Sequence, residues 1–128
     1  MSAKMTGIEI SAFEGKGYTR VHGFNGWCVA LINYADHLQT AHVSRLERHL
    51  LTDEVFLLLS GQASLFVGDE LREIPMETGK LYIVKKGAWH TVTLSEDACV
   101  AVVENDGTGP ENTQYYLDRG EADEDRSG

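Results

Sequence analysis

Three side chains suited to metal binding or acid–base chemistry, Glu47, His49 and Glu54, gather where an apolar run begins. Glu47 and His49 alternate, so a β-strand would place both on one face, with their side chains roughly 6.5 Å apart. Two side chains at that spacing can reach one ion. Glu54 begins the apolar run 54–60, where a carboxylate is costly to bury unless it is paired or bound to a metal. The pattern indicates a polar site at the end of a buried strand.

The segment that carries Glu47 and His49 fits two secondary structures. A strand over residues 40–49 would put Arg45 on the same face as Glu47 and His49. A helix competes, because Leu46 and His49 fit a 3.6-residue period and the neighbouring residues are good helix formers. The hairpins that follow in the sequence favour the strand.

Turn residues divide most of the chain into short β-branched and aromatic runs. This spacing predicts an all-β sandwich or barrel. We expect an arm with one or two short strands over residues 1–26, a single barrel domain over 27–117 and a disordered acidic tail over 118–128. The strands expected in the barrel span residues 27–35, 40–49, 54–60, 63–67, 71–76, 81–84, 89–94 and 99–104.

Length and charge exclude several classes of function. The chain has 128 residues, enough for one domain with one core. Its net charge of -9 argues against nucleic acid or an anionic membrane as a partner. No signal peptide or membrane-spanning run is visible, so we expect a cytoplasmic protein. Cys28 and Cys99 lie in apolar runs and are expected to be reduced thiols.

One motif carries a resemblance to the cupin family. The first cupin motif contains a glycine, a His-x-His pair, a glutamate and a second glycine at fixed spacing. His49, Glu54 and Gly61 match this motif in residue and spacing. Glu47 stands where the first histidine is usual, and Ala41 where the first glycine is usual.

A second motif strengthens the resemblance. Here Gly79, Gly87 and His90 match the family in residue and spacing, while Lys85 replaces a proline and Leu94 an asparagine. The matching positions of the two motifs span residues 47–90, and the hairpin pattern extends the resemblance over roughly 27–104. Both motifs occur in the expected order, so the chain resembles a small single-domain cupin.

The resemblance implies a double-stranded β-helix, or jelly-roll, barrel that forms a homodimer. It also implies that the side chains at positions 47, 49, 54 and 90 point into the barrel around a divalent metal. Two imidazoles and one carboxylate would match a facial triad with open positions, and this donor set suits manganese, iron, nickel or zinc. The implied ligands are Glu47, His49, Glu54 and His90.

The same residues admit an interpretation without a metal. Glu47 could pair with Arg45 or Lys85 in a satisfied polar network, and the two histidines could be ordinary hydrogen-bonded residues. Arg45 could instead hold a substrate carboxylate or phosphate in a bidentate grip, or lie at the barrel mouth. The remaining residues of this kind are expected on the surface, in loops or in packing: His22, His37, His42 and Trp89.

Three functions follow from this site. The first is a metal-dependent enzyme that acts on a small polar or anionic metabolite inside the barrel. The second is a non-catalytic binding protein whose metal site has drifted, which the glutamate at position 47 favours. The third is an interaction protein that works through its dimer surface. The fold does not choose among them.

Overall fold

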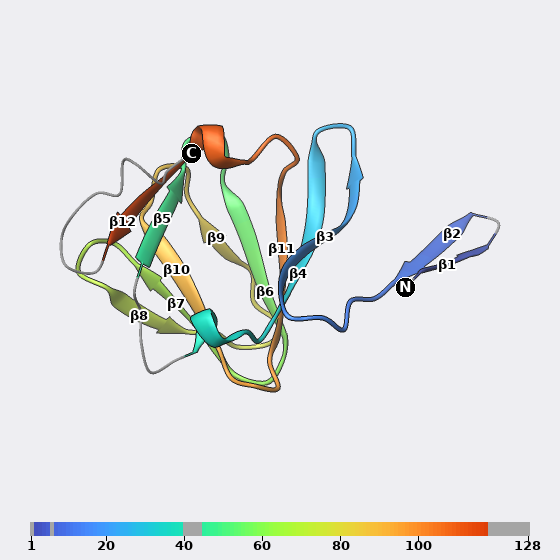
Figure 1. The fold of residues 1–128 in the computed structure, drawn as a ribbon, viewed down its shortest axis with the longest axis horizontal. Helices are drawn as coiled ribbons and strands as arrows, with labels where there is room; N and C mark the ends of the chain where they lie inside the picture. The colour runs from blue at the N-terminus through green and yellow to red at the C-terminus, as the bar shows by residue number, and fades with distance from the viewer. Residues whose placement is uncertain (1, 6, 40–44, 118–128) are drawn as a thin grey trace.

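Two five-stranded antiparallel sheets pack face to face in this computed structural model, which describes residues 2–5, 7–39 and 45–117 (Figure 1). One sheet has the order β12 (Thr113–Leu117), β5 (Arg45–His49), β10 (His90–Leu94), β7 (Ala63–Val67), β8 (Arg72–Pro75). The other has the order β3 (Gly17–Phe24), β4 (Trp27–Asn33), β11 (Cys99–Asn105), β6 (Glu54–Ser60), β9 (Tyr82–Val84). The predicted jelly-roll architecture is confirmed.

A separate hairpin of β1 (Ser2–Met5) and β2 (Ile8–Ser11) projects from the body (Figure 1). Two short 3₁₀ helices, η1 (Asp36–Leu38) and η2 (Pro110–Asn112), lie in the connections. Within the described residues, no helix is long and apolar enough to cross a membrane.

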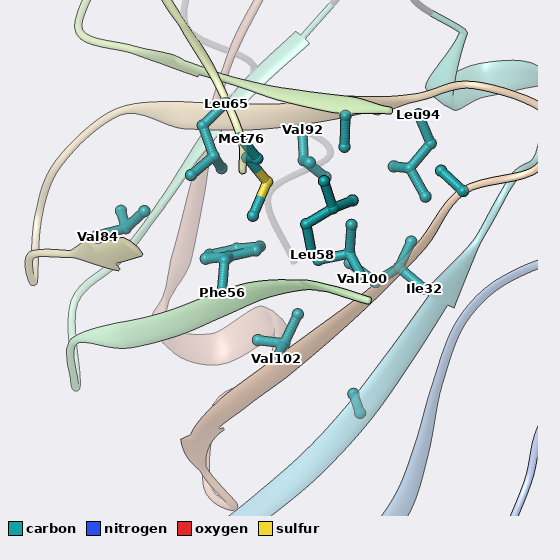
Figure 2. Close-up of a cluster of buried hydrophobic side chains, with 13 residues drawn as sticks. Ile32, Phe56, Leu58, Leu65, Met76, Val84, Val92, Leu94, Val100 and Val102 are labelled. Carbon is teal, nitrogen blue, oxygen red and sulfur yellow. The ribbon is translucent and has the colours of Figure 1, made fainter. Parts of the chain in front are cut away.

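The core lies between the two sheets, as Figure 2 shows. It forms because residues of one parity on each strand point inward: β6 buries Phe56 and Leu58, and β11 buries Val100 and Val102. Leu65 of β7 faces them from the other sheet. Each fully buried aliphatic side chain contributes about 1.5 to 3 kcal/mol relative to an exposed one.

The predicted strands at 54–60 and 63–67 are present with the same limits, as β6 and β7. The others in the barrel differ by one or two residues at their ends, except that β5 begins at Arg45. The first part of that predicted strand, residues 40–44, lies outside the described residues, as does the predicted disordered tail. Arg45–His49 is a strand and not a helix.

The sheets bring the candidate ligands together from three strands. His90 at the start of β10 lies opposite Glu47 of β5 in one sheet. Glu54 begins β6 in the facing sheet. The arrangement of these strands therefore brings the polar side chains together between the two sheets, at one end of the sandwich.

Candidate metal centre

Three of the four candidate ligands form a tight cluster. His49 Nε2 lies 3.3 Å from Glu54 Oε2, and His90 Nε2 lies 3.0 Å from Glu54 Oε1. One ligand atom from each of the three residues lies within 4.8 Å of the others. The three side chains could therefore hold a metal ion.

Hydrogen bonds fix which nitrogen of each imidazole is free. His90 Nδ1 lies 3.0 Å from the carbonyl oxygen of Ala88, which can only accept. His49 Nδ1 lies 2.9 Å from Thr113 Oγ1, and that hydroxyl donates its hydrogen to the carbonyl of Gly109 at 2.8 Å. Both Nδ1 atoms are therefore donors, so each Nε2 turns toward Glu54 with either a lone pair or a second proton. Outer partners orient metal-binding histidines in this way.

The carboxylate of Glu54 lacks a full set of partners. Its side chain is buried, and Oε1 accepts no hydrogen bond of good geometry from the described residues, although His90 Nε2 is near. A buried carboxylate oxygen without a hydrogen bond is costly. Neutral imidazoles would also turn their lone pairs toward this carboxylate, His90 toward Oε1 and His49 toward Oε2. A divalent cation between these atoms would satisfy all three residues, so the donor set fits the metal that the cupin resemblance implies.

The pKa shifts agree with this charge arrangement. Burial acts to raise the pKa of Glu54, but contacts with His90 and Glu104 outweigh burial, and its pKa is lowered. Burial acts to lower the pKa of His49, but the hydrogen bond to Glu47 and the charge of Glu54 outweigh it, and its pKa is raised. The cluster thus favours a negative carboxylate beside a positive charge, carried either by protons or by a metal.

Glu47 lies at the edge of this cluster. Its Oε1 is 3.1 Å from His49 Nε2, while its side chain is 34% exposed. The two cations considered as its partners are engaged elsewhere, because Lys85 pairs with Asp53 at 2.7 Å and Arg45 stacks on the ring of Tyr115 at 4.1 Å. Glu47 therefore contacts the site through His49.

His22, His37 and Trp89 lie apart from the cluster. His22 and His37 are exposed, as predicted, and His42 lies outside the described residues. Trp89 packs edge-on against Tyr116, with ring centroids 5.5 Å apart, which confirms its predicted packing role.

A second polar group, which the sequence analysis missed, adjoins Glu54. Glu104 of β11 is buried and shares a hydrogen bond with Glu54. The hydroxyl of Tyr18 donates to Glu104 Oε2, and Arg20 Nε donates to the Tyr18 oxygen at 3.2 Å. Glu104 has the same strand parity as Val102, so a charge on the inward face of an apolar strand was a usable signal. Nothing in the sequence marked Tyr18.

The raised pKa of Glu104 predicts that the stability of the metal-free protein depends on pH. Burial, followed by the hydrogen bond with Glu54, raises the pKa of Glu104 from 4.5 to about 7. A raised folded-state pKa stabilises the fold below pH 4.5, and this contribution is lost as pH rises toward 7. In chelator, the unfolding free energy should fall by up to about 1.4 kcal/mol per pH unit over this window.

Glu104→Gln isolates this contribution, since the amide can keep both hydrogen bonds but does not titrate. In urea titrations from pH 5 to pH 8, the variant should gain stability relative to the natural chain as pH rises. A constant difference between the two proteins across that range would contradict the assignment.

The fold and the cluster define a small β-sandwich with a candidate metal centre between its sheets. The sequence matches the Cupin domain family over residues 37–104, which is more than half of the chain. The chain therefore belongs to the cupin family. A comparison with curated proteins gives no match.

Solved structures share this fold at low sequence identity. A cupin-2 domain protein from Shewanella frigidimarina is 20% identical, with a TM-score of 0.56 over 73% of this chain and 84% of that one. Streptomyces PAC13, solved with uridine and described as a nucleoside dehydratase, has a TM-score of 0.60 at 9% identity over 82% of each chain. KdgF from Halomonas has a TM-score of 0.53 at 12% identity over 69% of this chain and 76% of that one. At these identities the likeness shows the fold alone.

Proposed function

We propose that this cupin binds a divalent metal through His49, Glu54 and His90, with Glu47 as a fourth ligand, and acts on a small polar metabolite. One observation carries the proposal: both imidazoles are fixed by Nδ1 hydrogen bonds so that their Nε2 atoms meet at Glu54. Two histidines and one carboxylate suit manganese, iron, nickel or zinc.

The bound metal would act as a Lewis acid that polarises an oxygen of the substrate. The side chains of the protein would orient the substrate and transfer protons. Glu47, partly exposed beside His49, could take or give a proton at its Oε1. Glu104, which is hydrogen-bonded to Glu54, accepts a hydrogen bond from the hydroxyl of Tyr18, whose ring is partly exposed. Polar groups therefore connect the buried centre to solvent from two directions.

Arg45 remains our proposal for binding an anionic group of the metabolite. It is exposed on β5, two residues before Glu47, and its guanidinium is held over the ring of Tyr115. Stacking on an aromatic ring leaves the guanidinium edge free for a carboxylate or phosphate. The structure of PAC13 with uridine, a nucleoside, supports a small polar ligand as the general class.

A non-catalytic binding protein is the second candidate, and the glutamate at position 47 favours it. Incubation of metal-loaded and metal-stripped protein with a panel of small polar metabolites separates the two. An enzyme should consume one compound only when loaded with metal, as followed by mass spectrometry. A binding protein should show a thermal shift with a compound and no consumption. No turnover and no thermal shift with either form of the protein would contradict both candidate functions.

We also propose that the chain is a homodimer, as the cupin resemblance implies.

Thr113 should control metal affinity without touching the metal. Its hydroxyl accepts from His49 Nδ1 and is buried. Thr113→Val keeps the shape but removes the acceptor, so it should weaken metal binding about 10- to 100-fold in calorimetric titrations with Zn²⁺. Thr113→Ser, which retains the hydroxyl, is the control and should bind within a few-fold of the natural chain. Equal affinities for both variants would argue against an oriented His49.

A further inference from the structure

Two polar side chains, Tyr18 and Arg20, stand at inward-facing positions of β3, the edge strand of its sheet (Figure 1). Tyr18 lies opposite Ile32 of β4 and Arg20 lies opposite Ala30, and both neighbours are buried in the core. Residues that face each other across an antiparallel pair lie on the same side of the sheet. A tyrosine and an arginine therefore occupy positions where β4 buries apolar side chains.

Arg20 donates hydrogen bonds from all three nitrogens of its guanidinium. Nε donates to the Tyr18 oxygen at 3.2 Å, Nη1 to the carbonyl oxygen of Asp106 at 3.0 Å, and Nη2 to that of Thr108 at 2.5 Å. The two carbonyls belong to the connection between β11 and β12, 86 and 88 residues after Arg20 in the sequence. A planar guanidinium can serve several fixed acceptors at once, which the point charge of a lysine cannot.

One branch of this network ends at the candidate metal ligand Glu54. The Tyr18 hydroxyl, which accepts from Arg20, donates to Glu104 Oε2. Arg20 Nη2 also lies 3.8 Å from the same oxygen. Glu104 in turn shares a hydrogen bond with Glu54. The orientation of the Glu104 carboxyl group, and through it that of Glu54, therefore depends on Tyr18 and Arg20.

The other branch ends at His49. Thr108, whose carbonyl oxygen accepts from Arg20, is followed by Gly109. The carbonyl of Gly109 accepts from the Thr113 hydroxyl at 2.8 Å, and that hydroxyl accepts from His49 Nδ1 at 2.9 Å. A shift of the peptide between Thr108 and Gly109 would therefore displace the group that orients His49.

Edge protection does not explain this arrangement. An inward-pointing charge on an edge strand opposes pairing with a second sheet edge. That role needs only a charge, so a lysine at position 20 would meet it. It requires neither three directed hydrogen bonds nor acceptors in two separate parts of the chain.

We propose that Arg20 is a positioning residue of the metal centre, which orients Glu54 and His49 at the same time through the two branches. The inference rests on the metal binding proposed above. Arg20 itself contacts neither ligand, and its side chain is 38% exposed. Because the two branches meet at one guanidinium, its loss should disturb both ligands together.

Arg20→Met tests the proposal in calorimetric titrations with Zn²⁺, since methionine removes every donor but fills part of the same space. We expect binding about 10- to 100-fold weaker than in the natural chain, the effect typical of an outer hydrogen-bond partner. Arg20→Lys retains the charge without the fork and should also bind at least about 10-fold more weakly. It serves as the second variant should Arg20→Met fail to fold. Arg72→Met, at an exposed arginine of β8 in the other sheet, is the matched control and should bind like the natural chain.

The visible absorption spectrum of bound Co²⁺ separates positioning from stability. A substitution that only destabilises the fold would lower the affinity but leave the coordination of the bound ion unchanged. The spectrum depends on the geometry of the ligands, so at saturation it should differ between Arg20→Met and the natural chain. Arg72→Met should give the natural spectrum.

The double variant Arg20→Met/Thr113→Val tests the branch to His49. Thr113→Val already breaks this branch, so the two losses of affinity should combine to less than their product. Losses that multiply in full would overturn the simultaneous action on both ligands. Natural Zn²⁺ affinity or a natural Co²⁺ spectrum in a folded Arg20→Met or Arg20→Lys variant would overturn the role of Arg20, while the metal centre would stand. A natural chain that binds neither ion would overturn the proposed metal binding and this inference together.

Discussion

Replacing Glu54 with glutamine is expected to abolish measurable metal binding while the protein remains folded. Glu54 is the residue that both imidazoles contact, at 3.3 Å from His49 and 3.0 Å from His90. The amide has nearly the same shape but no charge to offset a divalent cation. Loss of an outer hydrogen-bond partner costs about 10- to 100-fold in affinity, so loss of this proposed direct ligand should weaken binding by more than 100-fold.

Calorimetric titration with Zn²⁺ and Mn²⁺ measures this effect. Glu77→Gln is a suitable control, because Glu77 is exposed and pairs only with Lys80 among its described ion pairs. It should bind metal like the natural chain. Substitution of Glu47 separates its role: Glu47→Ala should weaken binding if it is a ligand, and Glu47→His should preserve or strengthen it. Normal metal affinity in Glu54→Gln would refute a centre built on this carboxylate.

Replacing Gly61 with alanine should destabilise the barrel more than any other single methyl addition at a turn glycine. Gly61 connects β6 to β7 with φ of +71°, a conformation that costs other residues about 1 to 2 kcal/mol. A Cβ there would lie 2.5 Å from Ala98 Cα and 2.7 Å from Ala98 N. These are backbone atoms that cannot move aside. Adding about 1 to 3 kcal/mol for overpacking, we expect a total loss of about 2 to 5 kcal/mol.

Gly79→Ala is the matched control for this effect. Gly79 has φ of +88°, but a Cβ there meets nothing within 4 Å. Its variant should therefore lose only the conformational part, about 1 to 2 kcal/mol. Urea unfolding of the two variants compares them directly. Equal losses of unfolding free energy in the two variants would show that the close approach of Ala98 is not a reason why position 61 requires glycine.

Much of the fold was predictable from sequence because local signals agreed. Residues 54–60 alternate in burial over their first five positions, residues 54–60 and 63–67 flank a glycine turn, and both strands were predicted with their observed limits. Arg45–His49 was ambiguous locally, since strand and helix patterns overlap over five residues. Its pairing with β10 and β12, which are distant in sequence, decides the strand.

Residues of the candidate site could be predicted only where they stand at the spacing of the two cupin motifs. His49, Glu54 and His90 stand at motif positions, and they converge in the structure. Thr113 could not be assigned a role from its own neighbourhood, and the inward position of Glu104 could not identify Glu54 as its partner, because both residues have partners on strands far away in sequence. Tyr18 reaches Glu104 through the order of β3, β4 and β11, which no local pattern specifies.

Metal content of the purified protein tests the central claim most directly. Untagged protein prepared without chelator would be analysed by inductively coupled plasma mass spectrometry beside His49→Ala and His90→Ala. We expect near-stoichiometric manganese, iron, nickel or zinc in the natural chain and little in either variant. A natural chain that contains no metal and does not take up any of the four when they are added would contradict a metal centre at His49, Glu54 and His90.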